Sequence, residues 1–160
     1  MYTAAKIQAE SKAEFYQELS TILAALLADE TDWLANLANA AALLFDQLPD
    51  INWAGFYLKK DGQLVLGPFQ GKPACTRIPL GKGVCGTAAA RGETLVVQDV
   101  HQFPGHIACD PNSRSEIVLP MKGALPGVLD IDSPVLRRFD QEDARGLQAF
   151  LDLLQKSIKK

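Results

Sequence analysis

Three cysteines are the side chains of this sequence best suited to nucleophilic or redox chemistry. Cys75, Cys85 and Cys109 are its only cysteines, and each is expected at the edge of an element. Each also has a structural interpretation, because a lone cysteine is more often a small buried hydrophobic residue than a catalyst. Cys85 follows a glycine-rich turn that opens a helix. A helix N-terminus favours the thiolate, so we expect a lowered pKa for this thiol.

Three acidic residues lie inside the most strand-like and apolar segments. Glu116 belongs to SEIVLPM, and Asp130 and Asp132 belong to GVLDIDS. Side chains alternate faces along a strand, so Asp130 and Asp132 share one face. A hairpin loop centred near Ala124 places Glu116 opposite Asp132, where like charges are destabilising. An exposed face would make these acids harmless. A buried pocket would raise at least one carboxyl pKa, keep a proton available for donation, and suit a substrate ammonium group.

Two aromatic residues belong to the strand-like segment NWAGFYL. Trp53 and Tyr57 share a strand face by their spacing. They are either ordinary core residues or an apolar wall of a pocket, facing a methyl or methylene group of a ligand.

A zinc site is the alternative use of the thiols. The candidate ligands are Cys75, Cys85, His101, His106 and Cys109. Their spacing is poor, because the chain has no C-x-x-C and His106-x-x-Cys109 is the only close pair. We therefore expect no metal.

Length and composition restrict the class of protein. The chain has 160 residues, of which 48% are hydrophobic and 22% charged, so we expect one globular domain over residues 1–160. The formal net charge is −3, so the composition lacks the excess of basic residues typical of nucleic-acid-binding proteins. No apolar run approaches the roughly 18 residues of a membrane span, and the first residues lack a signal-type apolar region. We expect a cytoplasmic protein without membrane contact, whose thiols are normally reduced.

Helical and strand patterns alternate along the chain. Apolar residues recur at helical spacing over 12–28 and 32–48. Asp61-Gly62 fits a two-residue hairpin turn, and a last helix begins near the N-cap residue Asp140. Residues 81–93 form a glycine-rich turn opening a short helix, and 100–114 form a loop or broken helical turn. Strands are predicted over 51–60, 63–69, 75–80, 94–100, 115–121 and 127–133. The order predicts an α+β fold around an antiparallel sheet.

Several motifs together resemble one enzyme family. They are NWAGFYL, GPFQG, ACTRIP, GVCG, HIAC, SEIV and LDIDS. This combination is similar to the free methionine-(R)-sulfoxide reductases, which are built on the GAF fold. The resemblance implies a sheet of about six strands, with the N-terminal helices and the C-terminal helix on one side. Loops and short helices would cover a ligand pocket on the other side. The stretch MKGALPG is a residue or two shorter than the matching hairpin of relatives.

The resemblance also implies an activity, the reduction of free L-methionine-(R)-sulfoxide by a thiol-dependent oxidoreductase that counters oxidative stress. Cys109 would be the nucleophile, Cys75 the thiol that forms a disulfide with it, and Cys85 a third thiol active in disulfide exchange. The Cys109 thiolate attacks the sulfoxide sulfur, and the acidic cluster protonates the leaving oxygen. The resulting sulfenic acid condenses with a thiol, and external thioredoxin, fed by NADPH, reduces the disulfide, so no resident cofactor is needed.

The family's binding residues map onto the segments already singled out. The acids and the two aromatic residues line its pocket, and loop amides near Ile107 and Ala108 are expected to hold the substrate carboxylate. The resemblance also makes a homodimer a reasonable expectation. The alternative function is a non-catalytic GAF module that binds a small ligand or senses redox state.

Overall fold

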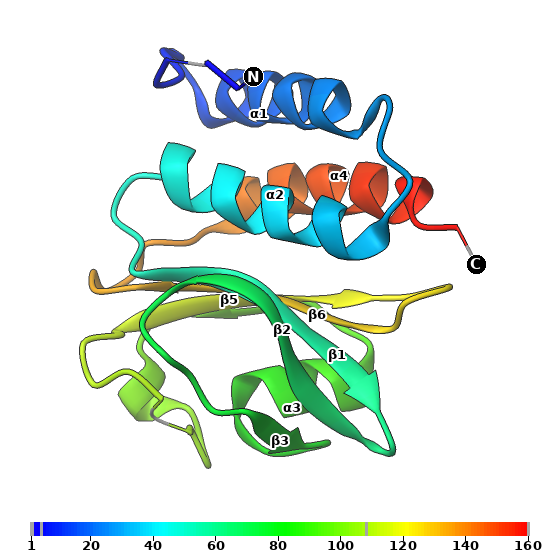
Figure 1. The fold of residues 1–160 in the computed structure, drawn as a ribbon. Helices are drawn as coiled ribbons and strands as arrows, with labels where there is room; N and C mark the ends of the chain where they lie inside the picture. Colours follow the sequence, from blue (N-terminus) through cyan, green and yellow to red (C-terminus); the bar gives the residue numbers. More distant parts are fainter. Residues whose placement is uncertain (1, 4, 108, 160) are drawn as a thin grey trace.

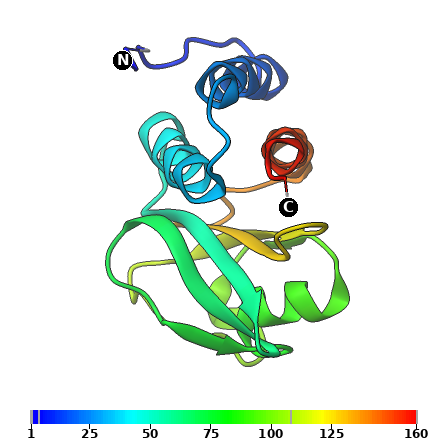
Figure 2. The ribbon, with the colours of Figure 1, turned by 45° about the vertical axis from the view of Figure 1, so that its right-hand side comes forward.

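The computed structural model describes residues 2–3, 5–107 and 109–159. Three long helices lie on one side of a six-stranded sheet: α1 (Lys12–Leu27), α2 (Trp33–Gln47) and α4 (Gln141–Ser157). The short helix α3 (Gly83–Arg91) lies on the other side (Figure 1). Figure 2 shows α1 as an outer layer that α2 and α4 separate from the sheet. The arrangement confirms the predicted α+β class and the placement of the helices.

The sheet has the strand order β3-β2-β1-β6-β5-β4, and all neighbouring strands are antiparallel. Two hairpins, β1–β2 and β5–β6, meet at its centre, where β1 pairs with β6. The strands are β1 (Trp53–Lys60), β2 (Gln63–Gly71), β3 (Arg77–Pro79), β4 (Leu95–Val97), β5 (Ser115–Met121) and β6 (Gly127–Ser133).

The two edge strands are shorter than their sequence patterns predict. β3 covers three residues of CTRIPL, and β4 covers three of TLVVQDV. Each of them pairs with only one neighbour. β4 ends at Val97. Two residues later, the Asp99 side chain accepts a hydrogen bond from the His101 backbone N–H and caps the 3-10 turn η1 (Val100–Gln102). The predicted broken helical turn within residues 100–114 is therefore present.

Each long helix begins at a side-chain cap, and the N-cap predicted for the last helix, Asp140, is confirmed. Ser11, Asp32 and Asp140 accept hydrogen bonds from backbone N–H groups of the first turns of α1, α2 and α4. Asp140 forms a reciprocal capping box with Asp143. No described helix is both long enough and apolar enough to cross a bilayer.

The sheet separates two hydrophobic clusters. Ile117, Leu119, Leu129 and Ile131 are fully buried in the cluster on the side of the three long helices. Their neighbours along the same strands, including Val118, face the smaller cluster beside α3. This alternation means that the acids of β5 and β6 are on the α3 side.

Candidate active site

The β5–β6 hairpin brings the three acids together on the α3 side of the sheet. Glu116 pairs with Asp132 across the β5–β6 ladder, and Asp130 is the next residue of β6 on that face. The loop joining the strands runs from 122 to 126, so the predicted centre near Ala124 and the predicted register are both confirmed. Trp53 lies opposite Asp132 on the other neighbour, β1.

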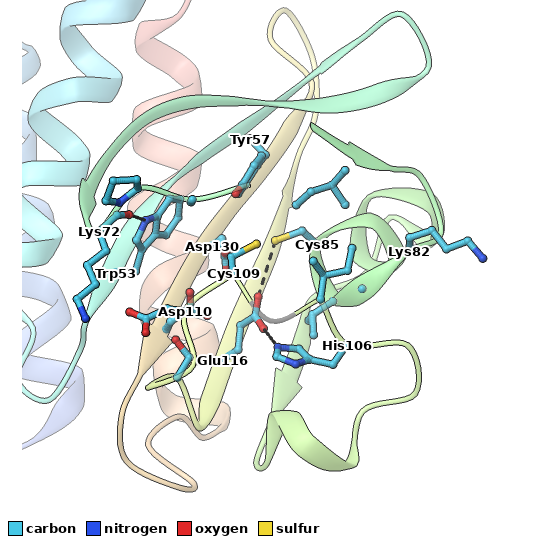
Figure 3. Close-up of a pocket in the computed structure, with 18 residues that line it drawn as sticks. Trp53, Tyr57, Lys72, Lys82, Cys85, His106, Cys109, Asp110, Glu116 and Asp130 are labelled. Carbon is cyan, nitrogen blue, oxygen red and sulfur yellow. Dashed lines mark hydrogen bonds and ion pairs between the residues drawn. The ribbon is translucent and has the colours of Figure 1, made fainter. Parts of the chain in front are cut away.

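A pocket is enclosed by this face of the sheet, the start of α3 and the loop that precedes β5 (Figure 3). Its lining includes most of the predicted site residues: Trp53, Tyr57, Cys85, Ile107, Cys109, Glu116, Asp130 and Asp132. Cys75 joins them through its bond to Cys109. Ala108 lies outside the described residues. One small pocket therefore holds the Cys109 sulfur and a group of acids, although the predicted residues that line it span positions 53 to 132.

A disulfide joins Cys75 to Cys109, 34 residues apart, with 5.8 Å between their Cα atoms. Cys75 lies in the loop between β2 and β3, and the Tyr57 hydroxyl donates a hydrogen bond of 2.9 Å to its carbonyl oxygen. This is the pairing that the resemblance implies. In this oxidised form, two of the five candidate zinc ligands are not available as thiolates, and exposed His101 contacts Asp99 instead. The absence of a metal site remains a prediction.

The expected lowering of the Cys85 pKa is wrong. The thiol lies in the first turn of α3 but is only 4% exposed. Burial raises its pKa well above the ordinary value, and the nearby charges of Asp130 and Glu116 raise it further. These two effects outweigh the dipole of a nine-residue helix. Cys85 is therefore a protonated thiol in the pocket floor rather than a ready thiolate.

The acids behave as the pocket interpretation predicts. Glu116 and Asp130 are each 5% exposed, and burial raises the pKa of all three carboxyl groups. The charge of Asp130 raises the pKa of both neighbours further. The acidic cluster can therefore keep a proton near neutral pH.

Glu116 is held between a thiol and an imidazole. Cys85 Sγ donates to its Oε1 at 3.8 Å, and His106 Nε2 lies 3.9 Å from its Oε2 (Figure 3). Burial lowers the pKa of His106 and raises that of Glu116, so near neutral pH this is a contact between two uncharged groups. Cys85, Glu116 and Asp130 each bring one potential metal-ligand atom within 4.8 Å of the others. Because their pKa values are all raised, the trio is suited to sharing protons.

The aromatic residues serve both predicted roles. Trp53 and Tyr57 are 3% and 2% exposed, and both line the pocket. The Trp53 ring stacks on Tyr57 at 5.9 Å and on Phe69 at 5.2 Å between ring centroids. The indole N–H donates to the Lys72 carbonyl oxygen at 3.2 Å. This rigid stack forms the apolar wall of the pocket.

Sequence reasoning missed the residues that fasten the loop around Cys109. The Asn52 amide donates hydrogen bonds of 3.1 Å to both Asp110 Oδ2 and Ser113 Oγ. Asp110 Oδ1 accepts from the Asn112 backbone N–H at 2.8 Å. The segment DPNS after Cys109 contains turn residues that could have signalled this local hydrogen bonding.

Other pocket residues had weaker signals in the sequence. Lys72 and Lys82 line the pocket, and Figure 3 shows the Lys82 side chain extending away from the acids. The sequence offers His106 as a candidate zinc ligand within a loop, but its side chain contacts Glu116. Nothing in the local pattern around a single histidine indicates such a partner on a distant strand.

Comparisons with known proteins agree with this geometry. The family described as GAF domain matches residues 22–158. The free methionine-R-sulfoxide reductase of Escherichia coli strain K12 is 58% identical over 92% of this chain and 91% of its own. The Saccharomyces cerevisiae protein of the same name is 43% identical, over 92% of this chain and 87% of its own.

A solved structure shares the fold over nearly the whole chain. It is the free methionine-R-sulfoxide reductase of Neisseria meningitidis in complex with its substrate. The TM-score is 0.92 at 46% identity, covering 98% of this chain and 95% of that one.

Proposed function

The chain belongs to the GAF-domain family and, within it, to the free methionine-R-sulfoxide reductases, and on that premise we propose that it reduces free L-methionine-(R)-sulfoxide to L-methionine. It is then an oxidoreductase whose electrons come from thiols. One observation carries the proposal: the sulfur of Cys109 and the carboxyl groups of Glu116, Asp130 and Asp132 line the same pocket. Sulfoxide reduction needs a nucleophilic sulfur and a proton donor at one reacting atom.

The first step takes place in the reduced protein. The Cys109 thiolate attacks the sulfoxide sulfur while Glu116 gives its proton to the leaving oxygen, because its raised pKa keeps that proton near neutral pH. The oxygen passes to the Cys109 sulfur as the bond between the two sulfur atoms breaks, so methionine leaves, reduced by two electrons, and Cys109 is oxidised to sulfenic acid. The Cys75 thiol then displaces water from the sulfenic acid, which produces the disulfide of this structure.

Recognition of the free amino acid follows from the enclosed site. Carboxyl groups that remain ionised attract the substrate ammonium, and buried Asp130 Oδ1 has no hydrogen-bond partner among the described residues. The stacked wall of Trp53 and Tyr57 faces the methyl and methylene groups. We propose that the Ile107 and Ala108 amides hold the substrate carboxylate. A peptide substrate would require chain on both sides of the methionine, and we propose that the pocket leaves no room for it.

The source of electrons and the setting are further parts of the proposal. Thioredoxin is the proposed reductant of the disulfide, with NADPH as the final electron source, and a cytoplasmic location would keep such a system reduced. Trp33 and Leu34 at the start of α2 and Phe45 near its end are large apolar side chains exposed to solvent, and a homodimer interface would cover such side chains. Light scattering of the purified protein measures the oligomeric state directly.

Methionine formation tests the proposal. The reduced protein is mixed with free L-methionine-(R)-sulfoxide, and methionine and the redox state of the cysteines are measured by mass spectrometry. We expect methionine and the Cys75–Cys109 disulfide to form in equal amounts. The S epimer is the matched control substrate. A Cys109→Ser variant should keep its fold and form no methionine, whereas an equally active variant would contradict the nucleophile assignment. Binding without turnover by the parent would favour a sensing module instead.

A further inference from the structure

The contact between His106 and Glu116 plays no part in the steps above. The imidazole lies 3.9 Å from Glu116 Oε2, with side-chain exposures of 16% and 7% for the two residues. On the opposite oxygen, Glu116 contacts Cys85. The carboxyl group is therefore held between a buried thiol and an imidazole that lies closer to solvent (Figure 3).

The fold holds His106 in this place through the chain on both sides of it. The His106 backbone N–H donates to the Phe103 carbonyl oxygen at 3.1 Å. The next side chain, Ile107, packs against Gly83 at the start of α3, where an added Cβ would lie 3.1 Å from it. The Cys109 N–H donates back to the Ile107 carbonyl oxygen at 3.1 Å. One short segment thus carries both the nucleophile and the imidazole.

Proton donation creates a charge that the cluster itself opposes. When Glu116 gives up its proton, a carboxylate forms in a buried site beside Asp130, and the repulsion that raises its pKa now acts against the product. Among the described contacts of this carboxyl group, Cys85 and Asp130 are acids themselves, whereas the imidazole can donate an N–H and carry positive charge.

On the basis of the proposed function, we propose that His106 is a positioning residue that acts through Glu116. Its Nε2–H stabilises the carboxylate that forms as the leaving oxygen is protonated, and the ring passes a replacement proton from solvent to Glu116. The protons balance: Cys109 releases one to solvent on becoming a thiolate, and Glu116 transfers one to the oxygen that becomes the sulfenic acid hydroxyl. The proton taken up through His106 restores Glu116.

A single-turnover experiment tests this role. Reduced protein, in excess, is mixed with free L-methionine-(R)-sulfoxide and quenched in acid, and methionine is measured against time at several protein concentrations. We expect His106→Leu to lower the maximal rate constant about tenfold or more, because a donor aimed at developing charge is lost. The protein concentration at half-maximal rate should change by less than about twofold, since the proposed contact acts on the chemical step. His106→Gln retains an N–H near the Nε2 position and should remain within about threefold of the parent.

Exposed His101 on the same loop provides the matched control, and His101→Leu should leave the rate constant within about twofold of the parent. Thermal unfolding verifies that each variant is folded. The inference is overturned if His106→Leu stays within twofold of the parent, or if His106→Gln is slowed as much as His106→Leu. A parent that forms no methionine overturns the proposed function, and this inference with it.

Discussion

Burial acts in the same direction on Glu116 and Cys85, with opposite consequences for their chemistry. It raises the pKa of both side chains. A raised pKa lets a carboxyl group keep a proton that it can donate near neutral pH, but it removes the thiolate through which a cysteine attacks. The same pocket floor therefore lets Glu116 hold a proton to donate near neutral pH and makes Cys85 a poorer nucleophile.

The reactivity of the three thiols should reflect this difference. In the reduced native protein, we expect an alkylating reagent to label Cys75 and Cys109 well before Cys85, because Cys85 is buried and its raised pKa leaves little thiolate. Mass spectrometry after timed quenching measures the order. The urea-unfolded protein is the control, in which all three should react at similar rates. Fast labelling of Cys85 in the native protein would contradict this assignment.

The Tyr57 hydroxyl should matter for disulfide formation rather than for attack on the substrate. Its hydrogen bond to the Cys75 carbonyl oxygen anchors the loop of the resolving thiol. Losing a hydrogen bond of about 1 kcal/mol in Tyr57→Phe should slow disulfide formation about fivefold. Methionine release in the first turnover should be nearly unchanged.

Trapping the sulfenic acid with a dimedone-type reagent measures the Tyr57→Phe effect, since the trapped fraction rises when resolution slows. Cys75→Ser gives the upper limit of trapping. A Tyr57→Phe variant with parental trapping but slow methionine release would instead place the hydroxyl in the chemical step.

At the scale of elements, the start of α3 and the loop of Cys109 form one unit. Gly83 begins the helix with a positive φ of 61°, and its missing Cβ leaves room for Ile107. The loop continues through Cys109 to Asp110, which Asn52 holds at the first strand. We therefore propose that a change at the helix terminus reaches the nucleophile through contacts within a few residues.

Gly83→Ala tests this connection and has a matched control in the same helix. Gly92 ends α3 with a similar φ of 66° but has no atom within 4 Å of an added Cβ. Both substitutions should lower stability by about 1 kcal/mol through backbone strain. Only Gly83→Ala should also displace Ile107 and lower the rate of methionine formation, which activity and thermal unfolding measure together. Equal activity of the two variants would contradict the proposed coupling.

At the scale of the whole molecule, the two faces of the sheet differ in composition and in function. The face toward the three long helices is packed with apolar side chains, and the α3 face combines an apolar cluster with buried acids. Buried carboxyl groups with raised pKa values destabilise the folded state wherever the unfolded chain would ionise them. The functional face therefore makes stability depend on pH.

The sign of this dependence can be worked out for Glu116. Its pKa is raised in the folded state, so the folded protein binds more protons than the unfolded chain above the usual range for glutamate, near pH 4.5. Its contribution to the free energy of unfolding therefore falls as pH rises above about 4.5, by up to about 1.4 kcal/mol per pH unit. Urea unfolding of the parent and Glu116→Gln across this range isolates the effect. We expect the variant to lose less stability, and parallel curves would contradict the raised pKa.

The disulfide should also change the stability of the whole molecule. It closes a loop across 34 residues, which corresponds to about 4 kcal/mol of stabilisation in the chain-entropy treatment. We expect a higher unfolding midpoint for the oxidised protein than for the reduced one. Cys109→Ser is the control and should respond little to reductant. Equal midpoints for the two parent forms would mean that the reduced chain is held equally well by other contacts.

The sequence by itself determined which side chains lie on each face of the β5–β6 hairpin and how its two strands are paired. Period-two alternation separates Asp130 and Asp132 from Leu129 and Ile131, and the loop centre at Ala124 sets Glu116 opposite Asp132. These are local properties, because each depends on neighbours along one or two adjacent strands. The α+β class follows from the same periodicities. The extent of one domain over residues 1–160 remains a prediction.

Only the tertiary structure decided how the site residues act on one another. The raised pKa of Cys85, the contact of His106 with Glu116 and the bond from Tyr57 to the Cys75 loop all join segments that are distant along the chain. The burial of these side chains and the distances between them arise from the packing of the whole chain, so no local sequence pattern predicts them. For the same reason, the position of Cys85 at a helix terminus predicts a lowered pKa for its thiol, which is wrong. Desolvation by the assembled pocket outweighs the local helix dipole.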